Sequence, residues 1–426
     1  MVKKLRYRLV AEEQYRPGVI QDVFDGAHYR RLQQTILDEA TGYHFFDSPH
    51  DIPLGVSTDG LSLFKRRRHG QSTAWPIIII NYGLHPSIRV RLENVICVGV
   101  IPGPKQCKDL NSFFVPLIEE LLELEAGIRI PMVSPVDENN DNPGPGDFYV
   151  SHIVLRAFLI ILFGDIPAIS KLLMMKGHNA VLYYVPLALP GNPPTPMPPN
   201  QLVLCTHPLF LTHYNAIEAA PTPVIRYQLM QAFGLNSRPV FSRLKSIDLA
   251  NCAPYDAMHL LFKNLVPNMI RHWTGNFKGI RQGTEGYEIK LEDWEEIGKL
   301  TTKAAKTIPS AFVGTLPNIA QDGHLYKAEA YAFWFQYIAP ILLEGRLQDK
   351  YYEHFLLMRE IIILALQFEL MPEHLDQLQH MIDTWIVQYQ DIKNINSQPA
   401  HSQYMPLSTS PTTSGLLAPS GLPGLS

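Results

Sequence analysis

The sequence IPLGVSTDGLSLFKRRRHGQSTAWPIIIINYG, residues 52–83, contains two apolar runs with a polar, basic segment between them. The first run, Ile52 to Thr58, has the β-branched composition of a buried strand, and it stops at Asp59-Gly60, a pair that favours a turn. The second run, Trp75 to Tyr82, also has strand character. The two runs predict two strands, with Asp59 at the end of the first.

The residues that follow predict a third strand and a helix. Val95 to Ile101 is apolar and closes at Pro102-Gly103-Pro104, so it fits a strand that could complete a three-stranded meander. Asn111 to Gly127, NSFFVPLIEELLELEAG, has apolar residues at helical spacing and ends at a glycine. It follows Asp109, a residue type that caps helices, and we predict an amphipathic helix here.

A second aspartate follows another apolar element. Pro131 to Asp147 is rich in Pro, Gly and Asn and predicts a loop, whereas Phe148 to Phe163 predicts a buried strand that ends at Gly164-Asp165. The order strand, strand, strand, helix, strand, with Asp59 and Asp165 after the first and last strands, is the order expected of a ribonuclease-H-like α/β core.

The C-terminal half of the sequence is predicted to be mainly α-helical. Residues 188–201, ALPGNPPTPMPPNQ, are too proline-rich for a helix or strand and predict an extended linker. Residues Gln398–Ser426 are rich in Ser, Pro, Thr and Gly and predict a disordered tail. Apolar residues at helical spacing predict helices over Ala216–Phe233, Ala257–Trp273, Leu291–Thr307, Lys327–Leu343, Tyr351–Leu370 and Glu373–Ile392.

These patterns divide the chain into five parts. The predicted parts are an N-terminal segment leading into the core (1–44), the α/β core (45–187), the linker (188–201), the helical region (202–395) and the tail (396–426).

Composition and charge exclude several classes of protein. With 46% hydrophobic residues, the chain can bury a large core. The formal net charge of -4 means that any contact with DNA requires a local basic surface. The four cysteines are widely spaced and include no CxxC pair, which favours a reducing intracellular compartment. The N-terminus lacks an apolar signal segment, and His152 and Arg156 break the most apolar stretch, so neither secretion nor membrane spanning is expected.

Four segments between Tyr15 and Asn179 follow one another in a characteristic order. They are YRPGVIQDVFDGAHYRRL, IPLGVSTDGLSLFKRRRHGQSTAWPIIIINYGLHPSIR, GVIPGPKQCKDLNSFFVPLIEELLEL and LFGDIPAISKLLMMKGHN. In these segments the sequence resembles the catalytic core of CACTA-type (En/Spm-like) DNA transposases. The resemblance continues more weakly through Cys252–Val266 and Lys327–Leu347, and so covers nearly everything except the tail.

This resemblance implies a DDE-type active site on a ribonuclease-H-like fold, in which three carboxylates hold two Mg²⁺ or Mn²⁺ ions for DNA cleavage and strand transfer. Such hard ions prefer oxygen ligands, and a pair roughly 4 Å apart stabilises both the attacking and the leaving oxygen at phosphorus. By the family's motifs, Asp59 in STDG is the expected first acid and Asp165 in GDIPA the second. Glu329 in KAEAYAFW is the expected third, and Asp256 in YDAMH is the competing candidate.

Each expected ligand also has a purely structural explanation. Asp59 before a glycine could form a turn, and Asp165 could cap a following helix. Glu329 could be a solvated helix residue. A metal site is therefore expected only if these side chains converge in space.

A basic run, Lys65-Arg66-Arg67-Arg68-His69, directly follows the first expected acid. It is predicted to contact DNA phosphates, with an affinity that falls as salt rises, and Arg89 and Arg91 could extend the same basic surface. The alternative is a solvated hairpin turn. A five-residue basic run also mimics a nuclear targeting signal, so the nucleus is the expected location.

One departure from the resembled family concerns zinc. In the family, a GHN-like sequence is followed by a CxxC pair that would form a structural metal site together with histidines. Here Gly177-His178-Asn179 is followed by no cysteine until Cys205-Thr206-His207, so a structural zinc site is not expected. His178 and His259 remain as isolated candidate ligands. Cys205-Thr206-His207 with His213 could supply three ligands, although their spacing follows no established pattern. Either the fold tolerates the missing pair or the enzyme is damaged.

DNA is the expected partner, as transposon ends or as non-specific duplex. Only 58 residues precede Asp59, which leaves no room for a separate N-terminal DNA-reading domain, so end recognition is expected to need another subunit. A homo-oligomer is the other expected assembly. The alternative to an active enzyme is a catalytically dead, transposon-derived scaffold that binds DNA or protein.

Overall fold

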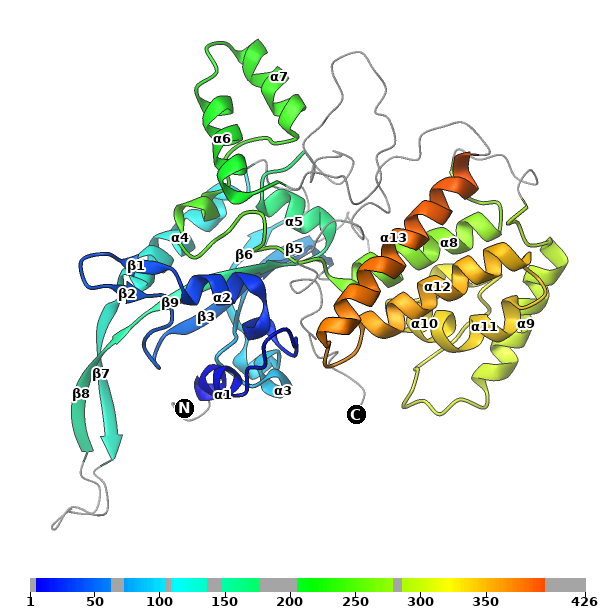
Figure 1. The fold of residues 1–426 in the computed structure, drawn as a ribbon, viewed down its shortest axis with the longest axis horizontal. Coiled ribbons are helices and arrows are strands. Elements are labelled where there is room, and N and C mark those ends of the chain that lie inside the picture. Colours follow the sequence, from blue (N-terminus) through cyan, green and yellow to red (C-terminus); the bar gives the residue numbers. More distant parts are fainter. Residues whose placement is uncertain are drawn as a thin grey trace.

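The computed structural model describes residues 5–62, 73–103, 107, 109–135, 148–176, 205–278 and 286–394. The protein is mixed α/β, with a central mixed sheet on one side and a helical part on the other (Figure 1). Its strands are β1 (Ile36–Asp38), β2 (Tyr43–His44), β3 (Ile52–Thr58), β4 (Leu61–Ser62), β5 (Thr73–Asn81), β6 (Ile96–Pro102), β7 (Ile128–Pro135), β8 (Phe148–Leu155) and β9 (Ala157–Phe163).

Helices flank the sheet and form the whole C-terminal part. The α-helices are α1 (Tyr7–Glu13), α2 (Ala27–Gln33), α3 (Pro86–Arg89), α4 (Asn111–Ala126), α5 (Ile166–Leu172), α6 (His207–Glu218), α7 (Pro223–Phe233), α8 (Val266–Trp273), α9 (Leu291–Ala305), α10 (Ala328–Phe333), α11 (Ala339–Leu343), α12 (Asp349–Ala365) and α13 (Pro372–Asn394). The short 3₁₀ helices are η2 (Val23–Asp25), η3 (Leu92–Asn94), η5 (Val240–Arg243) and η7 (Gly323–Leu325), and the π-helical segments are η6 (Met258–Leu265) and η8 (Trp334–Ile338).

The central sheet has the strand order β6-β5-β3-β9. The short strand β4 pairs with the same edge of β5 as β3 does. β3, β5 and β6 are antiparallel neighbours, whereas β3 and β9 are parallel. The strands predicted over Ile52–Thr58, Trp75–Tyr82 and Val95–Ile101 are therefore confirmed as one meander. The predicted helix over Asn111–Gly127 is confirmed as α4.

Both faces of the sheet are covered at β3 and β9, whereas most side chains of β6 are exposed. On one face α4, α5 and α6 pack in a buried cluster with Val56 and Leu162, and on the other face Phe46 from the N-terminal segment packs against Phe158. A sheet buried on both faces has strands that read as continuous apolar runs, because neither side chain direction faces water. Hydrophobicity alone therefore located β3 and the apolar run that contains β9.

The prediction for residues 131–163 is wrong in two respects. Part of the predicted loop is β-strand, because β7 extends to Pro135, and the predicted single strand Phe148–Phe163 is two strands, β8 and β9. Among the described strands, β7 and β8 pair with each other as an antiparallel ribbon that projects from the body (Figure 1). The partner changes at Arg156, whose carbonyl accepts from the Ile52 N–H at 2.9 Å and whose guanidinium lies 4.0 Å from the Tyr43 ring centroid.

Residues 205–252 pack on the sheet rather than with the helices that follow them. α6 and the residues from Leu235 to Cys252 belong to the same buried cluster as β3, β5 and β9. The Leu162 N–H donates to the Cys252 carbonyl at 2.7 Å, so this segment runs along the free edge of β9. The predicted helix Ala216–Phe233 is interrupted within it, because Thr222 caps a new helix, α7, by accepting from the Ile225 N–H at 3.3 Å.

A second hydrophobic core contains η6 and helices α8 to α13, together with Ile20 from the N-terminal segment. The helices predicted for this region are confirmed with shifted ends, although two of them contain π-helical turns. Within the described residues, no helix combines the length and the apolar character needed to cross a membrane. The predicted linker, 188–201, and the predicted tail, 396–426, lie outside the described residues.

Stability is expected to fall between pH 7 and pH 5 because of His354. This side chain is only 7% exposed, stacks on Trp385 and has its Nε2 3.1 Å from the Trp385 carbonyl. Burial lowers the pKa of His354 from 6.5 to about 4. A depressed histidine pKa contributes stability that is present above the unfolded pKa and is lost as pH falls towards the folded pKa, here about 2 kcal/mol by pH 5. Urea unfolding at both pH values should show this loss in the wild type and a smaller loss in His354→Phe, which keeps the ring stack.

Candidate active site

Asp59 and Asp165 lie at the carboxyl ends of two adjacent parallel strands. Asp59 directly follows β3, and Gly164 alone separates Asp165 from β9. Because Ser57 pairs with Phe163, continuing this register by two residues sets Asp59 opposite Asp165. Neighbouring strands in register project such residues to the same side. Two acids separated by over one hundred positions in sequence are thus brought to one edge of the sheet.

The end of β3 has a local cause. In the register of β3 with β5, Pro76 stands opposite Asp59, and a proline has no N–H to continue the ladder there. The Asp59 carboxylate is exposed and accepts a hydrogen bond from the Gly60 N–H at 2.6 Å. Gly60 lies against the Trp75 ring, since a Cβ at this position would be 3.0 Å from it. The chain therefore turns at Asp59 and leaves its carboxylate at the sheet edge.

Asp165 also caps helix α5. Its Oδ1 accepts a hydrogen bond from the Ala168 N–H at 2.7 Å. The side chain is half-buried. The structural explanation that the sequence offered for this residue is therefore correct. It leaves open a second role, because a carboxylate has two oxygens and each accepts more than one bond.

Asp256 approaches the same edge from the chain segment beside β9. This segment is fixed to β9 at Cys252, four residues earlier, and continues to the start of η6. Asp256 Oδ1 accepts from the Met258 N–H at 2.7 Å, and its Oδ2 lies 2.9 Å from His259 Nδ1. The result is an acid and histidine pair at the junction between the sheet and the helical part.

The electrostatics of His259 connect the three aspartates. The hydrogen bond with Asp256 raises the pKa of His259, burial opposes the increase, and the charges of Asp256, Asp165 and Asp59 add to it. Burial by itself would raise the pKa of Asp256, but the hydrogen bond and the charge of His259 outweigh it, and the pKa is lowered. The imidazole therefore responds to all three carboxylates.

Glu329, the expected third acid, lies in the first turn of α10 and is exposed. A Cβ at Gly314 would be 3.4 Å from its Oε1, which places the carboxylate beside that loop. α10 packs against η6, the segment that begins just after Asp256. The Glu329 carboxylate thus lies at the Gly314 loop, whereas Asp59 and Asp165 lie at the sheet edge.

The described residues contain no group of three His, Cys, Asp or Glu side chains arranged closely enough to hold one metal ion. Asp59, Asp165 and Asp256 fit a divalent cation by chemistry, since all three offer carboxylate oxygens. They approach one another at the sheet edge without closing into a complete ligand set. Holding an ion would require their side chains to move closer together.

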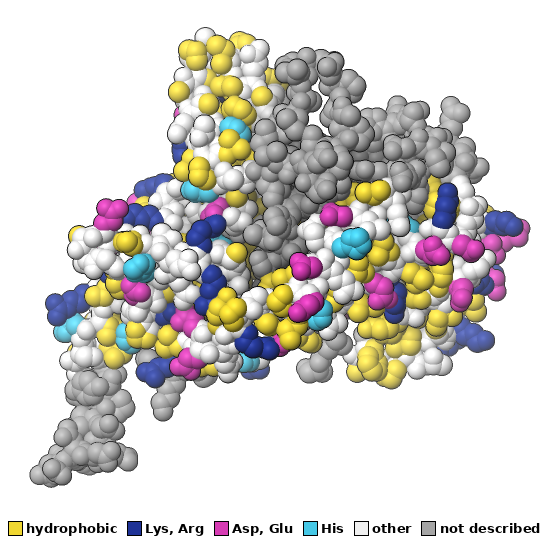
Figure 2. Space-filling view, viewed as in Figure 1, with side chains coloured by type: hydrophobic (Ala, Val, Ile, Leu, Met, Phe, Trp, Pro, Cys, Tyr) yellow, Lys and Arg dark blue, Asp and Glu magenta, His cyan; other side chains and the backbone are white. Residues whose placement is uncertain are grey.

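The predicted DNA-contacting run, Lys65 to Arg68, lies outside the described residues. The expectation that Arg89 extends this run is wrong, because its side chain is only 7% exposed and its guanidinium forms a two-point ion pair with buried Asp22. Arg91 is exposed, and its Nε donates to the Ser87 carbonyl at 3.2 Å. On the face shown in Figure 2, the Lys and Arg side chains lie scattered among Asp and Glu rather than in one basic surface.

The remaining zinc candidates have other partners. His207 Nδ1 accepts from the Leu249 N–H at 3.0 Å, and His213 stacks on Phe233 with ring centroids 4.0 Å apart. His259 is paired with Asp256, and His178 lies outside the described residues. Cys205 is half-buried, and burial raises the pKa of its thiol.

Comparison with known proteins supports the motif analysis. No curated protein matches the chain. Residues 18–181, which include β3 to β9 with Asp59 and Asp165, match the family model described as "Transposase family tnp2". This match supports the CACTA-type (En/Spm-like) transposase family for this segment.

Proposed function

We propose that the chain is the catalytic part of a DDE-type DNA transposase, in which Asp59, Asp165 and a third acid hold two divalent metal ions for DNA cleavage and strand transfer. The observation that carries this proposal is the position of Asp59 and Asp165 at the carboxyl ends of the adjacent parallel strands β3 and β9. The match of this segment to a transposase family gives the arrangement its chemical context.

The connectivity of the sheet supports a ribonuclease-H-like core. Three antiparallel strands, β3, β5 and β6, are followed by helix α4 and then by β9, which is parallel to β3 and lies on its other side. This is the element order that the sequence predicted for such a core, with acids after the first and last strands. Two adjacent parallel strands that both end at an acid support a shared site for the two carboxylates.

The proposed chemistry divides between the metal ions and the chain. Bound Mg²⁺ or Mn²⁺ would activate a water or a DNA 3′-hydroxyl and neutralise charge at the phosphate. The carboxylates of Asp59 and Asp165 would hold the ions, and helix α5 would fix the orientation of Asp165 through its cap bond to Ala168. His259 would orient Asp256 through its hydrogen bond.

The proposal is tested by metal-dependent nicking of a labelled DNA duplex. Purified chain should nick DNA with Mg²⁺ or Mn²⁺ and lose the activity when the metal is chelated, and Asp59→Ala should be inactive. Asp59 is exposed and outside the buried clusters, so this substitution should leave the melting temperature nearly unchanged. Equal nicking by the wild type and by Asp59→Ala would indicate a contaminating nuclease and sink the proposal.

The third acid is expected to be Asp256 rather than Glu329. Asp256 acts on the pKa of His259 together with Asp59 and Asp165, whereas Glu329 lies beside Gly314. Asp256→Asn should reduce nicking by roughly a hundredfold or more, and Glu329→Gln should retain activity within a few-fold. Both variants are isosteric and are compared at equal folded fraction. The reverse result would assign the metal-binding role to Glu329.

A second function is favoured by one observation. Among the described residues, no three Asp, Glu, His or Cys side chains are close enough together to bind one metal ion. This arrangement favours a catalytically inactive scaffold that binds DNA or protein. Such a scaffold would bind duplex DNA with an affinity that falls with salt and would not nick it at any metal concentration. The nicking assay and a salt titration of binding together separate the two functions.

A further inference from the structure

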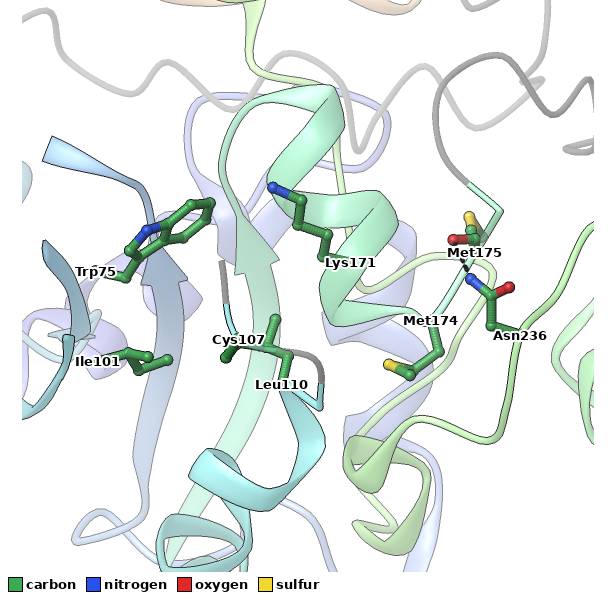
Figure 3. A pocket seen from close by; sticks show the side chains of 8 residues that line it. All are labelled: Trp75, Ile101, Cys107, Leu110, Lys171, Met174, Met175 and Asn236. Atoms are coloured by element: carbon green, nitrogen blue, oxygen red, sulfur yellow. Dashed lines mark hydrogen bonds between the residues drawn. The ribbon is translucent and has the colours of Figure 1, made fainter. Parts of the chain in front are cut away.

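A cavity of about 180 Å³ lies on the α4 face of the sheet, near the proposed active site. Trp75 of β5 forms one wall, and Lys171 of α5 and Met174 just after this helix form another (Figure 3). The lining is completed by Ile101, Cys107, Leu110, Met175 and Asn236. The lining is mainly apolar with a few polar groups, which is typical of a site for a small ring-shaped ligand.

Two residues that line the cavity also lie next to chain segments that carry the acids. The Trp75 ring touches Gly60, the residue after Asp59. Lys171 lies on α5, the helix that Asp165 caps, six residues or about 9 Å further along it. A group in the cavity would therefore sit beside a phosphate held at the acids.

The polar groups around the cavity have defined positions. The Lys171 ammonium lies 4.4 Å from the Trp75 ring centroid, in a cation–π contact. The Asn236 side chain is fixed because its amide donates to the Met175 carbonyl at 2.9 Å, and Figure 3 shows this bond. An aromatic face with a neighbouring cation and a fixed amide matches what an unpaired nucleobase and its phosphate require.

Size selects among the bases. A cavity of roughly 150 Å³ accommodates benzene, so the cavity here suits one six-membered ring better than the fused rings of a purine. Stacking of a base on an aromatic ring contributes more than an exposed cation–π contact, so an incoming base can displace Lys171 from the Trp75 ring. The displaced ammonium is then free to contact the phosphate of the same nucleotide.

We propose that this cavity binds one unpaired pyrimidine base of the DNA strand next to the phosphate held by Asp59 and Asp165. Trp75 stacks on the base, and Lys171 contacts its phosphate. The site would favour cleavage where a pyrimidine can leave the duplex, because unpairing has a cost that the cavity offsets. This inference rests on the proposed function for its substrate, but binding can be measured without catalysis.

The test measures binding to two short duplexes in the absence of divalent metal, one blunt and one ending in a single unpaired pyrrolo-deoxycytidine. The base fluorescence should be quenched on binding, and Trp75→Ala should weaken binding of the overhang duplex by roughly 5- to 100-fold, with little change for the blunt duplex. Trp75→Phe should keep most of the preference. A purine-analogue overhang, 2-aminopurine, should bind less tightly than the pyrimidine.

A second readout does not depend on substituting Trp75. In a Cys97→Ser background, alkylation of Cys107 mapped by mass spectrometry should be slowed by the overhang duplex and not by the blunt one, since Cys107 lines the cavity. Equal protection by both duplexes, or an equal loss of affinity for both in Trp75→Ala, overturns the proposal. Base binding that persists in a chain that never nicks DNA would instead reject the proposed function and leave this site in place.

Discussion

Replacement of Asp165 by asparagine is expected to abolish metal-dependent DNA cleavage while leaving the stability of the chain nearly unchanged. Asp165 serves as the cap of α5 and as a proposed metal ligand. Asparagine caps helices about as well as aspartate, because its amide oxygen accepts the same N–H. It carries no charge to hold a divalent cation. Loss of one ligand of a catalytic metal removes several kcal/mol of transition-state stabilisation, which corresponds to a decrease of roughly a thousandfold in the cleavage rate.

Two further substitutions separate the roles of Asp165. Asp165→Ser also keeps the cap and should be as inactive as Asp165→Asn. Asp165→Ala removes the cap bond to Ala168 and should lower the free energy of unfolding by about 1 kcal/mol in addition to losing activity. Cleavage rates are compared with urea unfolding curves for each protein. Full activity in Asp165→Asn would show that the residue is only a cap, and the two-metal site would lose its second member.

The sequence predicted the sheet well where burial on both faces produces apolar runs. β3 coincides with such a run, and the turn at Asp59-Gly60 marks its end. β6 also coincides with an apolar run, although most of its side chains are exposed. The prediction was wrong at β8, because the single apolar run from Phe148 to Phe163 forms two strands. β8 belongs to the two-stranded ribbon with β7, and β9 belongs to the central sheet. The pairing partner of a strand is a tertiary property, and hydrophobicity along the chain does not report it.

The sequence motifs predicted Asp59 and Asp165 as members of the candidate site, but they did not predict the other residues near it. Asp59 and Asp165 stand at strand ends, so their meeting follows once β3 and β9 pair in parallel. The approach of Asp256 depends on a single backbone contact, between Leu162 and Cys252, which joins segments that are remote in sequence. The role proposed for Trp75 had no sequence signal, because an aromatic residue in a buried strand is usually part of the core.

The largest expected effect on stability comes from Arg89. Its guanidinium contacts Asp22 through both terminal nitrogens and lies 4.8 Å from the Tyr82 ring centroid, and the side chain is 7% exposed. Asp22 in turn accepts from the Tyr7 hydroxyl at 2.9 Å. The pair therefore ties α1, η2 and α3 together beneath the sheet. The sequence presented Arg89 as part of a basic surface, whereas the fold uses it as an internal connection.

Arg89→Ala is expected to lower the free energy of unfolding by about 3–5 kcal/mol, because it leaves the Asp22 carboxylate buried without its counter-charge. Domains are stable by only about 5–15 kcal/mol, so this loss should be visible as a large decrease in the urea midpoint. The matched control is Arg91→Ala, two residues away and exposed, which should change stability by less than about 0.5 kcal/mol.

The double variant Asp22→Asn with Arg89→Met tests the cause of that loss. If the destabilisation of Arg89→Ala comes from an unpaired buried charge, removing both charges should restore much of the stability, since apolar replacement of a buried ion pair is often nearly neutral. If it comes from lost packing against Tyr82 and Tyr7, Arg89→Met alone should recover the stability, and the double variant should be no better than Arg89→Met. DNA affinity should be the same in the wild type and in correctly folded Arg89 variants, because a side chain enclosed by Asp22 and two tyrosine rings cannot reach a phosphate.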